Sequence, residues 1–358
     1  MPFCVERKKT RQIRVGSVKI GGGSPIAVQS MTNTPTADVA ATVSQIRRLE
    51  QAGCEIIRTA VADMESAKAL ALIKKQISIP LVADIHFDHR LAIASAEAGA
   101  DCLRINPGNI GSKSRVQSVV RAAADCGASI RTGVNAGSLD RDLRKKHGGP
   151  NAEALVESAL RQTGMLADMD FHEVKVSIKS SDVLRTIGAY RLFSEKSDIP
   201  LHIGITEAGG LYSGIVKSSI GIGAILLEGI GDTLRVSLTR DPVEEVRVGY
   251  EILKALGIRR RGPEIISCPT CGRCRIDLFT IADSVEKALL TNSAPIKVAI
   301  MGCEVNGPGE AKEADVGIAG GDGTGVLFKK GRVVKRFPQD RLVEELLSAV
   351  DEISRDRK

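Results

Sequence analysis

Short apolar runs alternate with longer amphipathic segments throughout residues 25–257. The runs are rich in β-branched residues and carry polar residues at every second position, which is typical of strands, whereas the longer segments repeat at helical spacing. The predicted strands are residues 25–30, 55–61, 80–86, 102–106, 129–135, 173–179, 200–206 and 233–239. Helices are predicted to follow them, for example at residues 37–53, 64–76, 113–127 and 243–257.

Eight strand-then-helix pairs within about 230 residues predict a (βα)8 TIM barrel, with a doubly wound open sheet as the alternative. Residues 258–263, Ile-Arg-Arg-Arg-Gly-Pro, interrupt the alternation and are predicted to be a linker. The remainder contains predicted strands at 264–267 and 297–301, helices near 277–290 and 339–353, and a hairpin at 326–335. The predicted fold class is therefore α/β, with an N-terminal TIM barrel over residues 1–257 and a smaller C-terminal α/β domain over residues 264–358.

The predicted barrel strands carry polar side chains on the face that normally fills the lumen with branched apolar residues. Their alternating neighbours, such as Ile85, Ile105 and Ile130, suit the face that packs against helices. The polar positions are Arg58, Asp84, His86, Arg104, Asn106, Arg131, Asn135, Lys175, Lys179, His202, Arg235 and Ser237. Converging cations repel one another unless an anion lies among them, and the planar guanidinium group suits phosphate. The pattern predicts a diphosphate-like ligand at the carboxyl ends of the strands.

Glu207 follows the end of a predicted strand and precedes glycines, a position where barrel enzymes place a catalytic acid or base. The alternative is that Asp84 and Glu207 are internal counterions of the cations. His86 and His202 are candidates for core residues, metal ligands or proton donors. Metal is the least favoured of these roles, because no third ligand stands at a matching spacing.

Half of the eight cysteines lie in the C-terminal part, namely Cys268, Cys271, Cys274 and Cys303. The Cys-x-x-Cys turn brings two sulfurs to one centre, and Cys303 supplies a third. Cys274, Glu304 and Glu310 are candidates for the fourth ligand. Spacing alone leaves zinc and an iron–sulfur cluster equally open, although a full zinc ribbon would have a second close cysteine pair.

The composition narrows the class of protein. Neither a secretory leader nor a membrane-spanning run is predicted, so the cysteines are expected to stay reduced in a cytoplasmic protein that does not bind a membrane. The formal net charge is +7, but there is no Trp and only 3% of residues are aromatic. Nucleic-acid binding would usually add exposed aromatic residues and a clustered basic face, so we do not expect a nucleic-acid partner.

Several longer strings are distinctive, namely Ser30-Met-Thr-Asn33, Asp84-Ile-His-Phe87, Arg104-Ile-Asn-Pro-Gly-Asn109, Ile205-Thr-Glu-Ala-Gly209, Ser267-Cys-Pro-Thr-Cys271 and Met301-Gly-Cys-Glu-Val-Asn-Gly-Pro-Gly-Glu310. Together they resemble the 4-hydroxy-3-methylbut-2-enyl diphosphate synthases, in the two-domain bacterial form, over nearly the whole chain. The resemblance implies an iron–sulfur oxidoreductase of the methylerythritol phosphate route to isoprenoids. It would reduce 2-C-methyl-D-erythritol 2,4-cyclodiphosphate by two electrons, with ring opening and loss of water.

The resemblance also implies roles for individual residues. A 4Fe-4S cluster would be held by Cys268, Cys271, Cys303 and Glu310, with Glu310 as a labile ligand. The catalytic residues would be Glu207, Glu310, Asp84 and His86. The substrate-binding residues would be Arg58, Arg104, Asn106, Arg131, Asn135, Lys175, His202, Arg235 and Ser237.

The family further implies flavodoxin or ferredoxin as electron donor, and a homodimer in which the barrel of one subunit faces the cluster domain of the other. This chain departs from the family pattern at Cys274, which adds a third cysteine to the turn, and at the variable position of Glu304. The competing hypothesis is a zinc-stabilised phosphate-binding or nucleic-acid-binding protein without redox activity.

Overall fold

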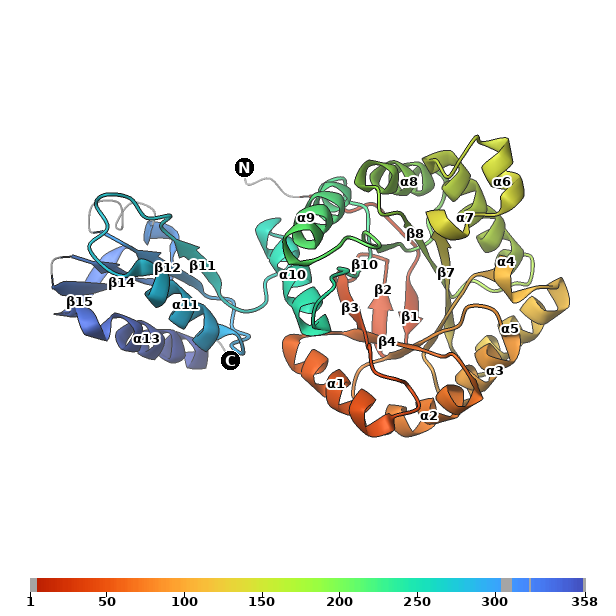
Figure 1. The fold of residues 1–358 in the computed structure, drawn as a ribbon, viewed down its shortest axis with the longest axis horizontal. Helices are drawn as coiled ribbons and strands as arrows, with labels where there is room; N and C mark the ends of the chain where they lie inside the picture. Colours follow the sequence, from red (N-terminus) through yellow and green to blue (C-terminus); the bar gives the residue numbers. More distant parts are fainter. Residues whose placement is uncertain (1–4, 304–310, 322, 357–358) are drawn as a thin grey trace. The chain divides into compact units, whose positions relative to one another are not determined.

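The computed structural model describes residues 5–303, 311–321 and 323–356. The chain divides into two compact units, Met1–Arg259 and Arg260–Lys358, which are coloured from red to green and in blue in Figure 1.

The first unit is a TIM barrel of parallel strands. Its strands are β3 (Ala27–Met31), β4 (Ile56–Ala60), β5 (Leu81–Asp84), β6 (Cys102–Ile105), β7 (Ser129–Asn135), β8 (Val174–Lys179), β9 (His202–Ile203) and β10 (Thr233–Leu234). They are hydrogen-bonded in the order β8-β7-β6-β5-β4-β3-β10-β9, and a parallel bridge between Val176 and Leu201 joins the two ends of this order. The predicted (βα)8 barrel is confirmed.

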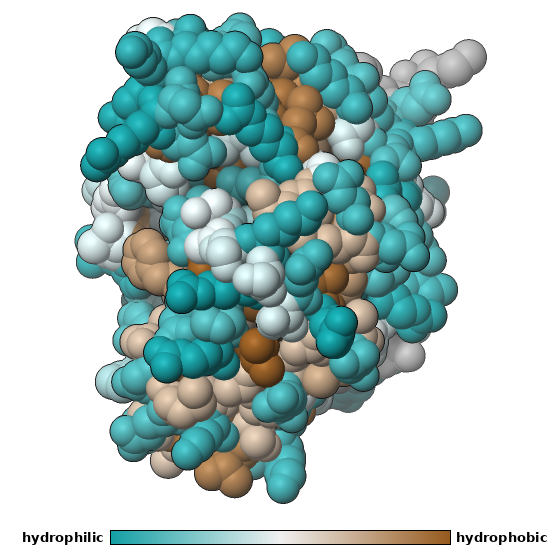
Figure 2. Space-filling view, turned by 90° about the vertical axis from the view of Figure 1, so that its right-hand side faces the viewer, coloured by the Kyte–Doolittle hydropathy of each residue, from teal (hydrophilic) through white to brown (hydrophobic). Residues whose placement is uncertain are grey.

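Helices surround the strands in a ring, as Figure 1 shows. The principal ones are α1 (Val39–Ala52), α2 (Met64–Lys74), α3 (His89–Glu97), α5 (Lys113–Asp125), α7 (Ala152–Ala167), α8 (Val183–Lys196), α9 (Leu211–Leu227) and α10 (Pro242–Ala255), with short helices α4 (Pro107–Ile110) and α6 (Arg141–Lys146) in the loops. Most begin at an Asp or Asn, such as Asp63 or Asn151, whose side chain accepts a hydrogen bond from a backbone N–H of the first turn. Seen from the right-hand side of Figure 1, the outer surface is mostly hydrophilic (Figure 2). The amphipathic helices therefore turn their apolar faces toward the strands.

The sequence did not predict a two-stranded hairpin near the amino terminus, β1 (Ile13–Val15) and β2 (Val18–Ile20). Its side chains pack against Ala27, Ile56, Val82 and Cys102, the first inward-facing residues of four barrel strands. The hairpin thus closes the amino-terminal end of the lumen with apolar contacts. The polar residues lie farther along the strands.

The last two barrel strands are shorter than predicted. Gly204 follows β9 directly and has a φ of 154°, which L residues rarely adopt, and an added Cβ there would lie 2.3 Å from the carbonyl oxygen of Arg235. The backbone therefore leaves regular pairing at this point, although the amide of Arg235 still donates to the carbonyl of Ile203 at 3.0 Å.

The second unit is a five-stranded mixed sheet. Its parallel strands are β11 (Glu264–Ser267), β12 (Lys297–Met301) and β13 (Val316–Gly320), and the antiparallel hairpin β14 (Thr324–Lys329) and β15 (Arg332–Pro338) extends it. Helices α11 (Leu278–Leu289) and α13 (Leu342–Asp356) share one apolar core with β12, β13 and β14. Within the described residues, no helix of either unit is both long and apolar enough to cross a membrane.

Candidate active site

The barrel lumen is polar beyond the layer closed by the hairpin. Its side chains are largely buried, with exposed fractions of 2% for Arg131, 0% for Lys175 and His202, and 8% for Arg104 and Lys179. The alternate residues of the same strands, such as Ile105 and Ile130, belong to the apolar core between strands and helices. The polar residues therefore face inward, as the period of two predicted.

Asp84 lies at the centre of the cationic cluster. Its Oδ1 accepts a hydrogen bond from Nη1 of Arg104 at 2.9 Å, and its Oδ2 lies 3.7 Å from Nε of Arg58. Burial by itself would raise the pKa of Asp84, but the charges of Arg58, Arg104 and Arg131 hold that pKa below its ordinary value. Asp84 is therefore an ionised counterion, and it balances part of the positive charge.

Other buried polar atoms of the lumen have no hydrogen-bond partner among the described residues. They include Nε of Arg131, Nζ of Lys175 and Nε2 of His202. Burial, reinforced by the neighbouring Arg58, lowers the pKa of Arg131 well below its ordinary value. Because an unpaired buried charge is costly, this arrangement is suited to an anion that would satisfy these donors.

A cavity of about 320 Å³ opens at the carboxyl ends of the strands, next to the buried cations. Its lining includes the predicted site residues His86, Arg104, Asn106, Asn135 and Glu207. Glu207 is exposed and has a φ of 53°, an uncommon backbone conformation for a residue other than glycine. Of the other predicted residues, Arg58, Asp84, Arg131, Lys175, His202 and Arg235 lie in the lumen layer and Ser237 in the loop after β10.

Lys179 also belongs to the cluster, as its place among the polar lumen positions predicted, although the family resemblance did not add it to the substrate-binding residues. An added Cβ at Gly204 would lie 2.9 Å from Nζ of Lys179, so this glycine leaves room for the ammonium group. Burial, followed by the charges of Arg131 and Arg235, lowers the pKa of Lys179 well below its ordinary value. Its position four residues after Lys175 on the same strand face was the available signal.

The cysteines of the second unit gather at the carboxyl ends of two neighbouring parallel strands. Cys268 follows β11 and its amide donates to the carbonyl of Ile300 in β12 at 3.1 Å, while Cys303 follows β12 by two residues. Cys271 is exposed in the turn between Cys268 and Cys274. Two thiols at adjacent strand ends and a third on the turn are suitable ligands for zinc or an iron–sulfur cluster.

The described side chains do not form a completed metal site. Within residues 5–303, 311–321 and 323–356, no three His, Cys, Asp or Glu side chains come together as a metal-binding group. The predicted ligand Glu310, and Glu304, lie outside the described residues. The fit of the cysteines to a cluster therefore depends on their chemistry and on their common position at the strand ends.

Cys274 has a structural environment of its own. Its thiol donates to the carbonyl of Ile276 at 3.3 Å, and its Sγ would lie 2.6 Å from a Cβ added at Gly302. The amide of Arg275 also donates to the carbonyl of Gly302, at 3.2 Å. Through these contacts the turn over residues 268–274 packs against Gly302, which follows β12 and directly precedes Cys303.

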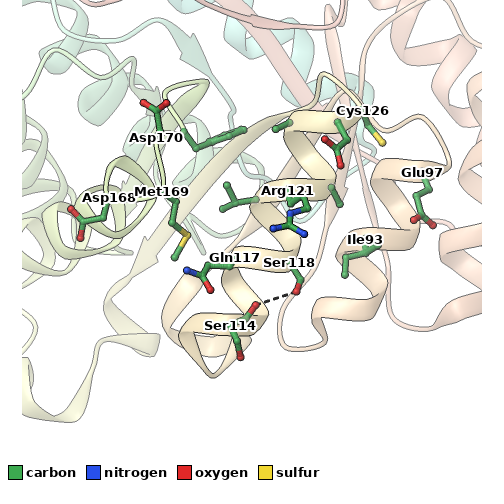
Figure 3. A pocket seen from close by; sticks show the side chains of 15 residues that line it. Ile93, Glu97, Ser114, Gln117, Ser118, Arg121, Cys126, Asp168, Met169 and Asp170 are labelled. Atoms are coloured by element: carbon green, nitrogen blue, oxygen red, sulfur yellow. Dashed lines mark hydrogen bonds between the residues drawn. The ribbon is translucent and has the colours of Figure 1, made fainter.

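The barrel has a larger cavity on its outer surface, of about 890 Å³, between α3, α5 and the turn that precedes β8. Figure 3 shows Gln117, Ser118 and Arg121 along α5 on one side of it, with Asp168 and Asp170 on the other. None of the predicted site residues lines this cavity. The larger cavity therefore does not coincide with the predicted site, which lies in the barrel lumen and at the carboxyl ends of its strands.

The fold and site define a TIM-barrel protein with a cation-lined lumen, followed by an α/β unit that carries cysteines at its strand ends. The chain belongs to the GcpE family: the GcpE TIM-barrel domain matches residues 10–250 and the GcpE protein C-terminal domain matches residues 264–352. The family resemblance predicted from the sequence is confirmed.

Two relatives are similar over nearly the full length. A 4-hydroxy-3-methylbut-2-en-1-yl diphosphate synthase (flavodoxin) of Desulfotalea psychrophila is 56% identical over 98% of each chain. The protein of the same name from Nitratidesulfovibrio vulgaris is 58% identical over 93% of this chain and 86% of its own. Among solved structures, 3-dehydroquinate dehydratase from Geobacillus kaustophilus matches with a TM-score of 0.50 at 17% identity, over 70% of this chain and 99% of its own, which shows the barrel fold alone.

Proposed function

We propose that the chain converts 2-C-methyl-D-erythritol 2,4-cyclodiphosphate to (E)-4-hydroxy-3-methylbut-2-enyl diphosphate. The observation that carries the proposal is a set of buried cationic atoms in the barrel lumen, next to the cavity at the carboxyl ends of the strands. Among the described residues, these atoms have no hydrogen-bond partner. The near full-length identity to relatives named for this product supports the same substrate class. The comparisons give no support to the zinc-stabilised binding protein considered as the alternative.

The lumen residues bind and orient the diphosphate. The proposed contacts come from Arg58, Arg104, Asn106, Arg131, Asn135, Lys175, His202, Arg235 and Ser237, and Lys179 joins them. Bidentate guanidinium groups fix the orientation of phosphate oxygens as well as their charge. Asp84 keeps Arg104 in place through the 2.9 Å hydrogen bond, so that part of the cation cluster is ordered before the ligand arrives.

Glu207 and His86 are the proposed groups for proton transfer at the mouth. Both line the cavity, and His86 lies against the guanidinium of Arg104 at 3.2 Å. The reaction breaks one ring C–O bond and removes a neighbouring hydroxyl, and two electrons enter the new C=C bond. The departing hydroxyl needs a proton to leave as water, which Glu207 would supply.

Cys268, Cys271, Cys303 and Glu310 are the proposed ligands of a 4Fe-4S cluster. When bound, such a cluster supplies electrons one at a time. Thiolate ligands require a reducing compartment, so a cytoplasmic location is part of the proposal. The electron donor is proposed to be flavodoxin, the protein named with the relatives, with ferredoxin as the alternative.

Anaerobic turnover tests the whole proposal. Protein purified without oxygen should be brown, with thiolate-to-iron absorption at about 410 nm, and should convert the cyclodiphosphate when supplied with reduced flavodoxin. A colourless, zinc-containing protein without turnover would instead favour the non-redox alternative.

Substrate binding should be accompanied by proton uptake at mildly alkaline pH. Burial, together with the charges of Arg131 and Arg58, lowers the pKa of Lys175 from 10.5 to about 8. An anion favours the charged ammonium and raises this pKa, so affinity should fall as pH rises through about 8. The folding stability of the ligand-free protein should depend on pH in the opposite direction. Between pH 8 and 10.5 the unfolded chain holds more protons at Lys175 than the folded chain does, so the contribution of Lys175 to the free energy of unfolding rises with pH.

Calorimetry at pH 8.5 in two buffers of different ionisation enthalpy measures this uptake. The observed binding enthalpy of the cyclodiphosphate should depend on the buffer. Lys175→Met should reduce that dependence without removing it, because Lys179 still takes up a proton on binding. Equal buffer dependence in both proteins would contradict the assignment of the proton to Lys175.

A homodimer with shared sites is also proposed, in which the barrel of one subunit works with the cluster domain of the other. Mixing inactive Arg131→Met protein with inactive Cys303→Ser protein, after unfolding and refolding together, should then restore activity. In the mixed dimer, an intact barrel meets an intact cysteine set in one of its two sites. Mixtures that form heterodimers and stay inactive would exclude this arrangement.

A further inference from the structure

Glu245 is a buried carboxylate in the first turn of α10, and it reaches from the helix layer to the carboxyl end of β10. Its exposed fraction is 3%. The neighbouring Glu244, by contrast, has a side chain that is 39% exposed and pairs with Arg247 of the same helix. Two adjacent glutamates of one helix therefore have different environments, which makes Glu244 a natural control for Glu245.

Four donors from two segments, β3 and the loop that follows β10, converge on the Glu245 carboxylate. Oε1 accepts hydrogen bonds from Nη2 of Arg235 at 2.9 Å and from the amide of Leu238 at 3.0 Å. Oε2 accepts from Nε of Arg235 and from Oγ of Ser30, both at 3.3 Å. One carboxylate thus joins the end of β3 to the loop that follows β10.

This arrangement determines which edge of Arg235 remains available. The Nε and Nη2 side of the guanidinium is held by Glu245, which leaves Nη1 for a ligand. Ser237, the other proposed substrate contact after β10, lies between Arg235 and Leu238, and both of these are bound to the same carboxylate. Because the Arg235 side chain is 21% exposed, packing alone does not fix it.

Glu245 also balances the charge on this side of the lumen, as Asp84 does around Arg58 and Arg104. Burial lowers the pKa of Arg58 to about 10, and Glu245 is among the charges that oppose this shift. Its charge opposes the lowered pKa of Lys179 in the same way. The Glu245 carboxylate therefore offsets part of the effect that burial has on the pKa of these two cations.

We propose that Glu245 is a positioning residue for diphosphate binding, which holds Arg235 and Ser237 in the orientation that receives the phosphate oxygens. It does so through the 2.9 and 3.0 Å hydrogen bonds to Arg235 and Leu238. The proposal rests on the proposed function. It adds a residue that is not among those lining the cavity at the carboxyl ends of the strands.

Glu245→Gln is the principal test, because the amide keeps the size of the side chain but loses its charge and one acceptor. We expect KM for the cyclodiphosphate to rise by about 10- to 100-fold, with kcat changed less than about threefold. Glu244→Gln should leave both constants unchanged. Arg235→Lys removes the other partner of the same contact. The double variant Arg235→Lys/Glu245→Gln should therefore raise KM little more than either single substitution does.

NMR of the ligand-free protein tests the role of Glu245 independently of whether the protein turns over the cyclodiphosphate. In the unsubstituted protein, the Nε–H of Arg235, assigned with the Arg235→Lys variant, should give a slowly exchanging arginine NMR signal. Glu245→Gln should remove that signal and Glu244→Gln should retain it. A retained signal in Glu245→Gln overturns the proposal, and so does a lost signal with unchanged KM, because Glu245 would then be structural. Absence of turnover in the unsubstituted enzyme counts against the proposed function, while the NMR comparison still decides the role of Glu245.

Discussion

Replacing Arg131 with methionine is expected to abolish useful substrate binding and yet to stabilise the free protein. Arg131 is 2% exposed, and its Nε has no hydrogen-bond partner among the described residues. Loss of a buried charged contact to the diphosphate should cost at least about 2 kcal/mol, or roughly 30-fold in affinity. Removing a poorly compensated buried cation should also increase the free energy of unfolding, by on the order of 1 kcal/mol.

A loss of affinity together with a gain of stability would show that Arg131 serves binding rather than folding. Binding of the cyclodiphosphate is measured by calorimetry and stability by thermal unfolding of the ligand-free protein. Arg161→Met is a matched control, because Arg161 is an exposed cation on α7 that pairs with Asp142 and Glu157. It should change neither quantity appreciably. If Arg131→Met lowered Tm and left the affinity unchanged, Arg131 would be a structural residue.

The barrel was predictable because its two signals are local and repeated. Each strand shows the period of two, and each helix follows at a similar distance, so eight weak indications support one another. The same period placed Arg104, Arg131 and Lys175 in the lumen. Strand ends were less predictable, since Gly204 ends β9 through a backbone conformation that alternating residues do not reveal.

The β1–β2 hairpin and the role of Glu245 could not be predicted from the strand and helix periods. The strands β1 and β2 have three residues each, too few to establish a period. Glu245 stands in the first turn of a helix, where acidic residues are common for reasons of the helix dipole. Its reach to Arg235 and Leu238 depends on how α10 packs against the barrel, which is a tertiary property.

Replacing Cys303 with serine is expected to abolish binding of the proposed iron–sulfur cluster and with it all reductive activity. Cys303 is 9% exposed and follows β12, beside the strand end that carries Cys268. A serine oxygen is a much poorer ligand for iron than a thiolate, so the proposed set would lose one of its three sulfurs. Iron and sulfide content, together with the absorption at about 410 nm, should fall to background while the barrel remains folded.

Cys274→Ser is the matched comparison within the same turn. The Cys274 thiol donates to the carbonyl of Ile276 and lies against Gly302, and a serine hydroxyl can make the same hydrogen bond. This variant should therefore keep its iron, its colour and most of its turnover. If Cys274→Ser lost the cluster and Cys303→Ser kept it, the ligand set would be wrong. In that case Cys274, rather than Cys303, would bind the metal, and its contact with Gly302 would have to open for binding.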